Sequence, residues 1–180
     1  AVYYRDIGLY YPSIVAAASL IRQSPAGSIE NAPTFLQRLV YPIYYANLIV
    51  PEAQAANIDP MIIFSLMRAE SLFDGAVTSS AAAGGLMQII PPTARWIATR
   101  LGEKDFRLEQ LSQIGTNVRF GTFYLRSVLD DLAEHEPNLG RRVVCVENRA
   151  HEPQAPAPDL AFAATFVRDV RRPEGSRRPE

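Results

Sequence analysis

Apolar residues recur at helical spacing along most of the chain, and proline and glycine separate the runs. Alternating patterns typical of strands are nearly absent, so the pattern predicts an all-α protein. Residues 10–23 form the first clear helix, and the tyrosine-rich residues 34–50 predict one or two more short ones. The apolar face of the first helix consists of Ile14, Ala17, Ala18 and Ile21.

The best-marked helix begins at Asp59 and Pro60. Aspartate is a preferred N-cap, and proline suits the first helical position, where no backbone N–H is needed. Glu70, near the end of this helix, lies seven, four and three residues after three apolar positions. It therefore shares their face. Those positions are Ile63, Leu66 and Met67.

Two further helices are predicted after a loop of small residues. One covers residues 93–102, with Gly102 as its stop. The other covers residues 111–132 and is long and amphipathic. Gly121 inside it costs about 1 kcal/mol in helix propensity relative to alanine, so we expect it to permit close contact with another helix. The apolar seam consists of Ile114, Val118, Gly121, Leu125, Val128 and Leu132.

After residue 132 the character changes. Residues 133–180 are rich in proline and arginine, and we expect weak or irregular structure there. A metal site could be imagined from Cys145, His135 and His151, but their spacings match no compact zinc pattern. We therefore expect neither a metal nor a cofactor.

Composition narrows the class of protein. The chain has 180 residues, 48% of them hydrophobic, and a net charge of −1. This composition is typical of a globular protein, and the length suffices for one domain and part of a second. The net charge near zero gives no electrostatic reason to expect nucleic-acid binding. The single cysteine excludes an internal disulfide. No apolar run reaches the roughly 20 residues of a membrane-spanning helix, and no signal peptide stands in this chain.

Glu70 is the candidate for chemistry. A carboxyl group on an apolar helix face is desolvated, which raises its pKa and suits it to general acid catalysis. The alternative is a structural glutamate at a helix end that reaches solvent or pairs with an arginine. The helix alone leaves both interpretations open.

Three ordered motifs bear on this choice. They are Glu70-Ser71-x-Phe73, then Gly85-Leu86-Met87-Gln88 followed by Pro91-x-Thr93-Ala94, and finally Asn117-x-x-x-Gly121. Together they resemble the soluble lytic murein transglycosylases, whose SLT catalytic domain is related to goose-type lysozyme. The resemblance covers residues 34–132. It implies a lysozyme-like catalytic domain over 46–132, preceded over 1–45 by the end of an α-superhelical region.

The resemblance also implies roles for single residues. Glu70 matches the family's one catalytic acid/base. Ser79, Gln88, Met87 and Ile90 match substrate-contacting positions. Structural roles remain alternatives for each of these four, with Ser79 as a turn residue and Met87 and Ile90 as core.

The implied reaction is cleavage of the β-1,4 bond between N-acetylmuramic acid and N-acetylglucosamine in peptidoglycan. The product would carry a 1,6-anhydro ring, formed without water, metal or cofactor. The partners would be glycan strands, the protein a monomer, and its location the bacterial periplasm or cell envelope.

One family motif is missing. An Ala-Tyr-Asn helix should follow the helix at 111–132, but no tyrosine occurs after Tyr124. We hypothesise that residues 133–180 are read out of frame or otherwise depart from the family. Two alternative functions therefore stay open: a hydrolytic goose-type lysozyme, and a catalytically impaired peptidoglycan-binding module.

Overall fold

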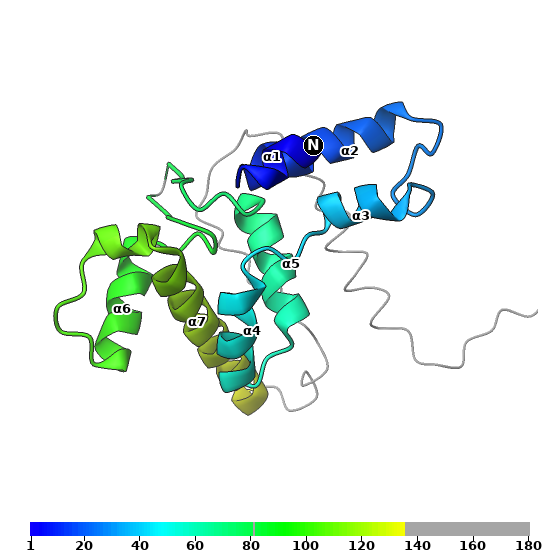
Figure 1. Ribbon diagram of the computed structural model, residues 1–180. Coiled ribbons are helices and arrows are strands. Elements are labelled where there is room, and N and C mark those ends of the chain that lie inside the picture. The colour runs from blue at the N-terminus through cyan, green and yellow to red at the C-terminus, as the bar shows by residue number, and fades with distance from the viewer. Residues whose placement is uncertain (81, 136–180) are drawn as a thin grey trace, which may run out of the picture. The chain divides into compact units, whose positions relative to one another are not determined.

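The computed structural model describes residues 1–80 and 82–135, so the expectations for the tail beyond residue 135 lie outside it (Figure 1). The described residues are mostly helical and contain no strand, which confirms the all-α class. None of the described helices is long and apolar enough to cross a membrane. The elements are α1 (Val2–Asp6), α2 (Tyr10–Gln23), α3 (Thr34–Val40), α4 (Ala46–Ala55), α5 (Pro60–Ser71), α6 (Pro91–Leu101), a 3-10 helix η1 (Leu108–Ser112) and α7 (Ile114–His135).

The chain divides into two compact units, Ala1–Tyr124 and Leu125–Glu180. All the residues discussed below as a candidate site belong to the first unit. In the second unit the described part is the end of α7, where Arg126 and Asp130 form an ion pair of 2.7 Å.

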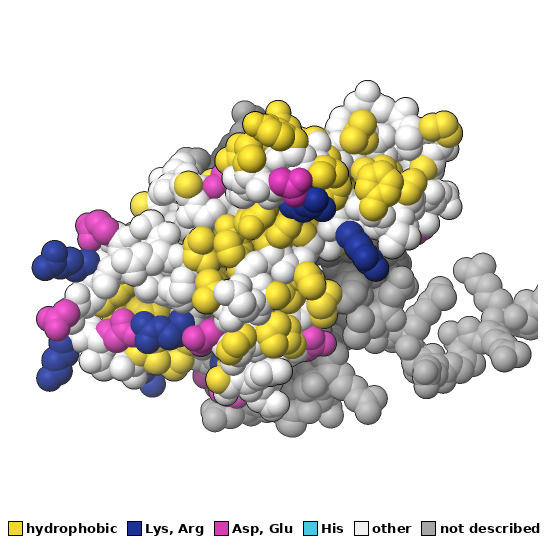
Figure 2. Space-filling model, viewed as in Figure 1, with side chains coloured by type: hydrophobic (Ala, Val, Ile, Leu, Met, Phe, Trp, Pro, Cys, Tyr) yellow, Lys and Arg dark blue, Asp and Glu magenta, His cyan; other side chains and the backbone are white. Residues whose placement is uncertain are grey.

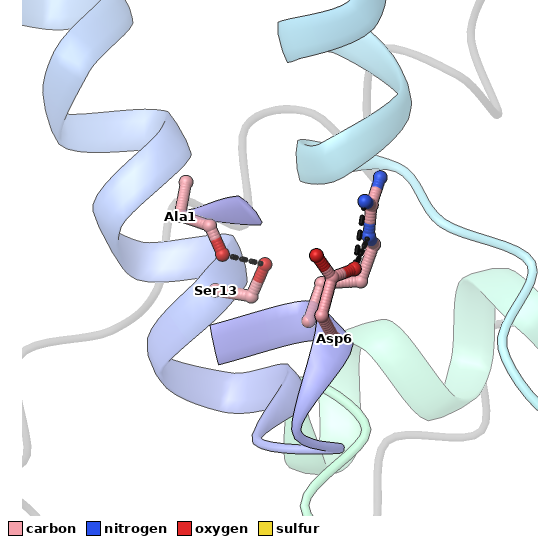
Figure 3. A network of polar contacts seen from close by, with 4 residues as sticks. Ala1, Asp6 and Ser13 are labelled. Atoms are coloured by element: carbon pink, nitrogen blue, oxygen red, sulfur yellow. Dashed lines mark hydrogen bonds and ion pairs between the residues drawn. The ribbon is translucent and has the colours of Figure 1, made fainter. Parts of the chain in front are cut away.

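The predicted apolar face of α2 is largely confirmed: Ile14, Ala17 and Ile21 are buried. Ala17 and Ile21 form a core with residues of α3. The face also contains Ser13, fully buried, whose hydroxyl donates to the Ala1 carbonyl oxygen at 3.0 Å and ties α1 to α2 (Figure 3). The sequence pattern did not predict α1 because this five-residue helix buries none of its side chains.

The outer side of α1 and α2 is unusually apolar. Of the twelve large hydrophobic residues that are exposed in the described part of the chain, eight lie between Val2 and Leu20. Figure 2 shows hydrophobic side chains gathered over these helices. Exposed apolar groupings of this kind are typical of surfaces that pack against something else.

Tyrosines connect α2 to the residues that follow α5. The rings of Tyr10 and Tyr44 are stacked, with centroids 3.8 Å apart, and Tyr44 meets Phe73 edge to face at 5.6 Å. Offset and edge-to-face pairs are the favoured aromatic geometries. The tyrosine-rich segment before α4 thus packs directly beside the end of α5.

Several predicted helix boundaries were wrong. The helix expected over residues 111–132 begins at Ile114, after the 3-10 helix η1, and continues to His135. The helix expected to end by residue 50 continues as α4 to Ala55, through Pro51. Proline removes only one backbone hydrogen bond there, and the fully buried Ile49 and Ala53 hold the helix together on both sides of it. The helix expected from residue 93 begins at Pro91, where prolines fit the first turn.

The predicted cap residues are confirmed. Asp59 Oδ1 accepts a hydrogen bond of 2.9 Å from the Met61 amide, and Pro60 is the first residue of α5. Gly102 ends α6 with φ 73°, a left-handed conformation that glycine adopts without strain.

The expected partner of Gly121 was wrong. A Cβ at this position would overlap the side chain of Met87, which lies in the loop between α5 and α6 and not on a helix. The missing side chain in α7 therefore makes room for that loop. Val118, one turn earlier, is fully buried as predicted.

Candidate active site

Glu70 is the penultimate residue of α5 and is half-buried. Ile63 and Met67, on the same face, are completely buried. Burial raises the pKa of the Glu70 carboxyl above its ordinary value, because the charged form loses solvation. Within the described residues no ion pair or hydrogen bond involves this carboxyl, so the predicted alternative of an arginine partner is not realised there.

The chain turns sharply just after Glu70. Leu72 and Phe73 both adopt left-handed backbone conformations, with φ 49° and 61°. Two consecutive non-glycine residues in this region are costly, and such strain clusters at functional sites. Phe73 offsets the cost by burying its ring almost entirely, against Tyr44. Asp74 then accepts from the Ala76 amide at 3.0 Å and starts the loop.

The loop returns to α5 through a short hairpin-like segment. The backbones of Gly84 and Ile89 exchange two hydrogen bonds, of 3.1 and 3.2 Å. They enclose residues 85–88, the Gly-Leu-Met-Gln motif. We call residues 84–89 the motif turn. Gly84 also forms an isolated bridge with Thr78 in the preceding part of the loop, which fixes the start of the turn.

Two polar side chains hold the motif turn from outside it. On α5, the hydroxyl oxygen of Ser71 lies 2.9 Å from the Leu86 carbonyl oxygen and 3.1 Å from that of Met67. On α7, Asn117 Oδ1 accepts from the Met87 amide at 2.8 Å. The Asn117 amide nitrogen donates to the carbonyl oxygens of Gly84 at 2.9 Å and Leu111 at 3.0 Å.

Ser79 and Gln88 make contacts within the loop. The Ser79 hydroxyl accepts a hydrogen bond of 3.1 Å from the Ala83 amide and, like any hydroxyl, can also donate one. Gln88 is buried, with φ 46°, and its side-chain nitrogen donates to the carbonyl oxygens of Gly85 and Val77. Both residues therefore stabilise the loop.

Met87 and Ile90 differ in exposure. Met87 is buried, 5% exposed, with its side chain against Gly121. Ile90 is half-buried and forms the N-cap position of α6. Met87 and Gln88 lie within the motif turn, whereas Ser79 and Ile90 lie in the loop segments that flank it. Sugar contact by any of the four stays a prediction.

Ser71 and Asn117 belong to the sequence motifs described above, but no role was predicted for either residue. One signal was available: Asn117 falls three residues after Ile114 and four before Gly121, on the apolar seam of its helix. An amide at 1% exposure needs hydrogen-bond partners, and the motif turn supplies most of them. The spacing of residues along one helix does not reveal which backbone groups of the loop will bind this side chain, because that depends on tertiary structure.

The arrangement offers acid–base chemistry with one carboxylate. A carboxyl group that keeps its proton in a partly desolvated position can donate it, and afterwards accept another. In the part of the chain that the structure describes, no group of three His, Cys, Asp or Glu residues is placed to hold a metal ion.

Comparison with known proteins identifies the family. The model of the family described as "Transglycosylase SLT domain" matches residues 47–144, which is more than half of the chain. The chain belongs to this SLT family. The resemblance predicted from the three motifs is thereby confirmed.

Individual SLT relatives are much longer than this chain. The soluble lytic murein transglycosylase of Salmonella typhimurium is 33% identical over 89 residues, which cover 49% of this chain and 14% of that protein. An inactive Glu-to-Gln mutant of the lytic transglycosylase Slt from Pseudomonas aeruginosa matches in structure with a TM-score of 0.59 and 25% identity. That match covers 78% of this chain and 20% of the other.

A second solved structure supports the fold alone. The 70 kDa soluble lytic transglycosylase from Escherichia coli matches with a TM-score of 0.52 and 21% identity, over 66% of this chain and 23% of that one. The chain thus spans between about a seventh and a quarter of the length of these relatives.

Proposed function

We propose that this SLT protein is a lytic transglycosylase that cleaves the β-1,4 bond between N-acetylmuramic acid and N-acetylglucosamine of peptidoglycan. The observation that carries the proposal is the half-buried carboxyl of Glu70, which has no hydrogen-bond or ion-pair partner among the described residues and whose pKa burial raises. It stands at the end of α5, next to the residue that contacts the motif turn. Family membership supports the same reaction class.

In the proposed mechanism Glu70 acts twice. Protonated Glu70 gives its proton to the glycosidic oxygen, the bond to the muramic acid C1 breaks, and the released strand leaves with a hydroxyl. The 2-acetamido oxygen of the muramic acid stabilises the developing cation. Glu70, now a carboxylate, takes the proton of the sugar's own 6-hydroxyl, whose oxygen bonds to C1 and closes the 1,6-anhydro ring. Substrate assistance replaces the second carboxylate that most glycoside hydrolases use.

We further propose that four residues of the loop form part of the glycan site. Ser79 and Ile90 keep exposed surface and would contact the sugar directly. Met87 and Gln88 are mostly buried and would act chiefly by fixing the motif turn. For Ser79 the donor would be its hydroxyl hydrogen, because its oxygen already accepts from Ala83.

Two other functions stay in view. The sequence lacks the family's Ala-Tyr-Asn motif after Tyr124, which favours a catalytically impaired peptidoglycan-binding module. A hydrolytic, goose-type lysozyme would use the same acid but let water attack. The three functions predict different products: anhydro ends, none, and reducing ends.

Product analysis decides among them. Purified peptidoglycan is incubated with the protein, with Glu70→Gln, and with Glu52→Gln as a control that changes another half-buried glutamate, on α4. The expected result is 1,6-anhydromuramic acid ends by mass spectrometry for the wild type and Glu70→Gln at least about 100-fold slower, as for the loss of a general acid. Reducing ends would identify a hydrolase. Equal inactivity of wild type and Glu70→Gln, with retained binding to peptidoglycan, would identify the binding module.

We also propose the domain organisation and location that follow from this function. Residues 1–45 would be the end of an α-superhelical region, which the exposed apolar side of α1 and α2 supports. Residues 46–132 would be the catalytic region. The place of action would be the bacterial periplasm or cell envelope, where peptidoglycan is.

A further inference from the structure

Asn117 occupies an unusual position for an amide side chain. It is 1% exposed, in the middle of the buried face of α7. Its oxygen accepts from the Met87 amide, and its nitrogen donates to the carbonyl oxygens of Gly84 and Leu111. Asn117 thus binds one donor inside the motif turn and one acceptor at its start.

Two glycines make this arrangement possible. A Cβ at Gly85, which has φ 74°, would collide with the Asn117 side chain and lie 2.9 Å from the Leu111 carbonyl oxygen. A Cβ at Gly121, one helical turn after Asn117, would collide with Met87. The amide and Gly121 together form a socket on α7 that receives the backbone and one side chain of the motif turn.

A second contact joins the turn to the end of α5. Leu86, fully buried, presents its carbonyl oxygen to the Ser71 hydroxyl at 2.9 Å, one residue after Glu70. The turn is therefore held both by Asn117 and by the helix end that carries Glu70. A shift of the turn would therefore be transmitted to the residue next to Glu70.

We infer that Asn117 is a positioning residue for catalysis: it fixes the motif turn against the end of α5, and so sets the geometry and dryness around Glu70. The inference rests on the proposed role of Glu70 as the acid. Asn117 itself does not contact the reacting atoms. Its effect on catalysis passes through the turn.

The test compares Asn117→Ala with a variant of equal stability. Ile97 on α6 is fully buried, and Ile97→Val or Ile97→Ala, whichever lowers Tm by the same amount, serves as the control. Both are measured well below their Tm. The first readout is the pKa of Glu70, which is measured by NMR titration of protein with isotope-labelled glutamate side chains. The Glu70 signal is assigned as the one that is missing in Glu70→Gln. The second is kcat and KM for release of anhydro ends from glycan strands.

The expected result has two parts. In Asn117→Ala the pKa of Glu70 falls toward the ordinary carboxyl value, because water reaches a site that burial now protects. Its kcat drops about tenfold to a hundredfold with KM nearly unchanged, as for a misplaced catalytic group. The Ile97 control keeps the wild-type pKa and kcat. If Asn117→Ala titrates and turns over like the control, the inference is overturned and Asn117 is only structural.

Two provisions keep the outcome clear. If Asn117→Ala does not fold, Ser71→Ala removes a single oxygen that contacts the same turn. It should lower the pKa of Glu70 in the same way, and an unchanged titration would overturn the inference. The NMR titration can also be carried out on a protein that has no enzymatic activity. A wild type that releases no anhydro ends would contradict the proposed function alone, and the titration would still decide the role of Asn117.

Discussion

The hydroxyl oxygen of Ser71 lies 2.9 Å from the carbonyl oxygen of Leu86, fifteen residues further along the chain. This contact joins the helix that carries Glu70 to the motif turn. Both groups are buried, with Ser71 at 7% and Leu86 at 0% exposure, so water is poorly placed to replace either partner. A small hydroxyl directly after the candidate acid therefore has a defined structural task.

Replacing Ser71 by alanine should destabilise the protein by about 1–3 kcal/mol, the cost of leaving a buried carbonyl without a partner. Urea unfolding measures the difference. Ser65→Ala, on the exposed side of the same helix, is the matched control and should be neutral or slightly stabilising, since alanine favours helices. Equal stability of the two variants would mean that the contact with Leu86 contributes nothing net.

Local signals predicted several features of the fold well. The start of α5 follows from Asp59 and Pro60, whose capping roles depend only on neighbouring residues. The end of α6 follows from Gly102 for the same reason. The short α1 and the continuation of α4 through Pro51 were not predicted. Their stability depends on tertiary contacts, as in the hydrogen bond from Ser13 to Ala1.

The candidate site was likewise predictable from the sequence only in part. The desolvation of Glu70 could be anticipated from its position three and seven residues after apolar ones. The groups that hold the motif turn could not, because Asn117 lies 30 residues from the Met87 amide that it binds. Spacing along α7 indicated that Gly121 permits a close approach. It gave no indication that the approaching group is a loop methionine.

Two glycines of α7 should respond oppositely to alanine. Gly121→Ala places a methyl group into Met87, and such overpacking typically costs about 1–3 kcal/mol. Gly115→Ala meets open space and should be neutral or stabilise by up to about 1 kcal/mol, through helix propensity. Thermal unfolding of both variants measures the contrast.

The double variant Gly121→Ala with Met87→Ala locates the cause of the Gly121 effect. If the methyl group clashes with Met87, removing that side chain should recover part of the loss, so the two effects would not add. Simple additivity would show that the Gly121 effect arises elsewhere in the helix.

Arg68 joins α5 to the end of α3. Its Nε donates to the Val40 carbonyl oxygen at 2.8 Å, and its guanidinium lies 4.2 Å from the centre of the Tyr41 ring. Burial lowers the pKa of this guanidinium, yet it stays charged at any accessible pH. Arg68→Ala should cost about 2–3 kcal/mol, through the lost charged hydrogen bond and ring contact.

The comparison that isolates this geometry uses lysine. Arg68→Lys keeps the charge but not the planar group, so it should recover less than half of the loss measured by chemical denaturation. Arg22→Ala, on the exposed end of α2, should be within about 0.5 kcal/mol of the wild type. Full recovery by lysine would mean that charge alone accounts for the contribution of Arg68.

Glu70 should make the protein less stable as the pH rises. Its pKa is raised in the folded state by burial, so between the unfolded and the folded pKa the native protein binds more protons than the unfolded chain. Stability attributable to this group is then fully present below the unfolded pKa and is lost as the pH rises through the folded pKa.

The variant Glu70→Gln, a neutral isostere, should not show this loss of stability with rising pH. The Tm of the variant minus that of the wild type should therefore grow from acidic to neutral pH. Glu52→Gln, measured identically, separates this effect from the general loss of a negative charge. A Tm difference for Glu70→Gln that does not change with pH, or that shrinks toward neutral pH, would show that the Glu70 carboxyl is not desolvated. It would then also contradict the protonated Glu70 on which the proposed reaction depends.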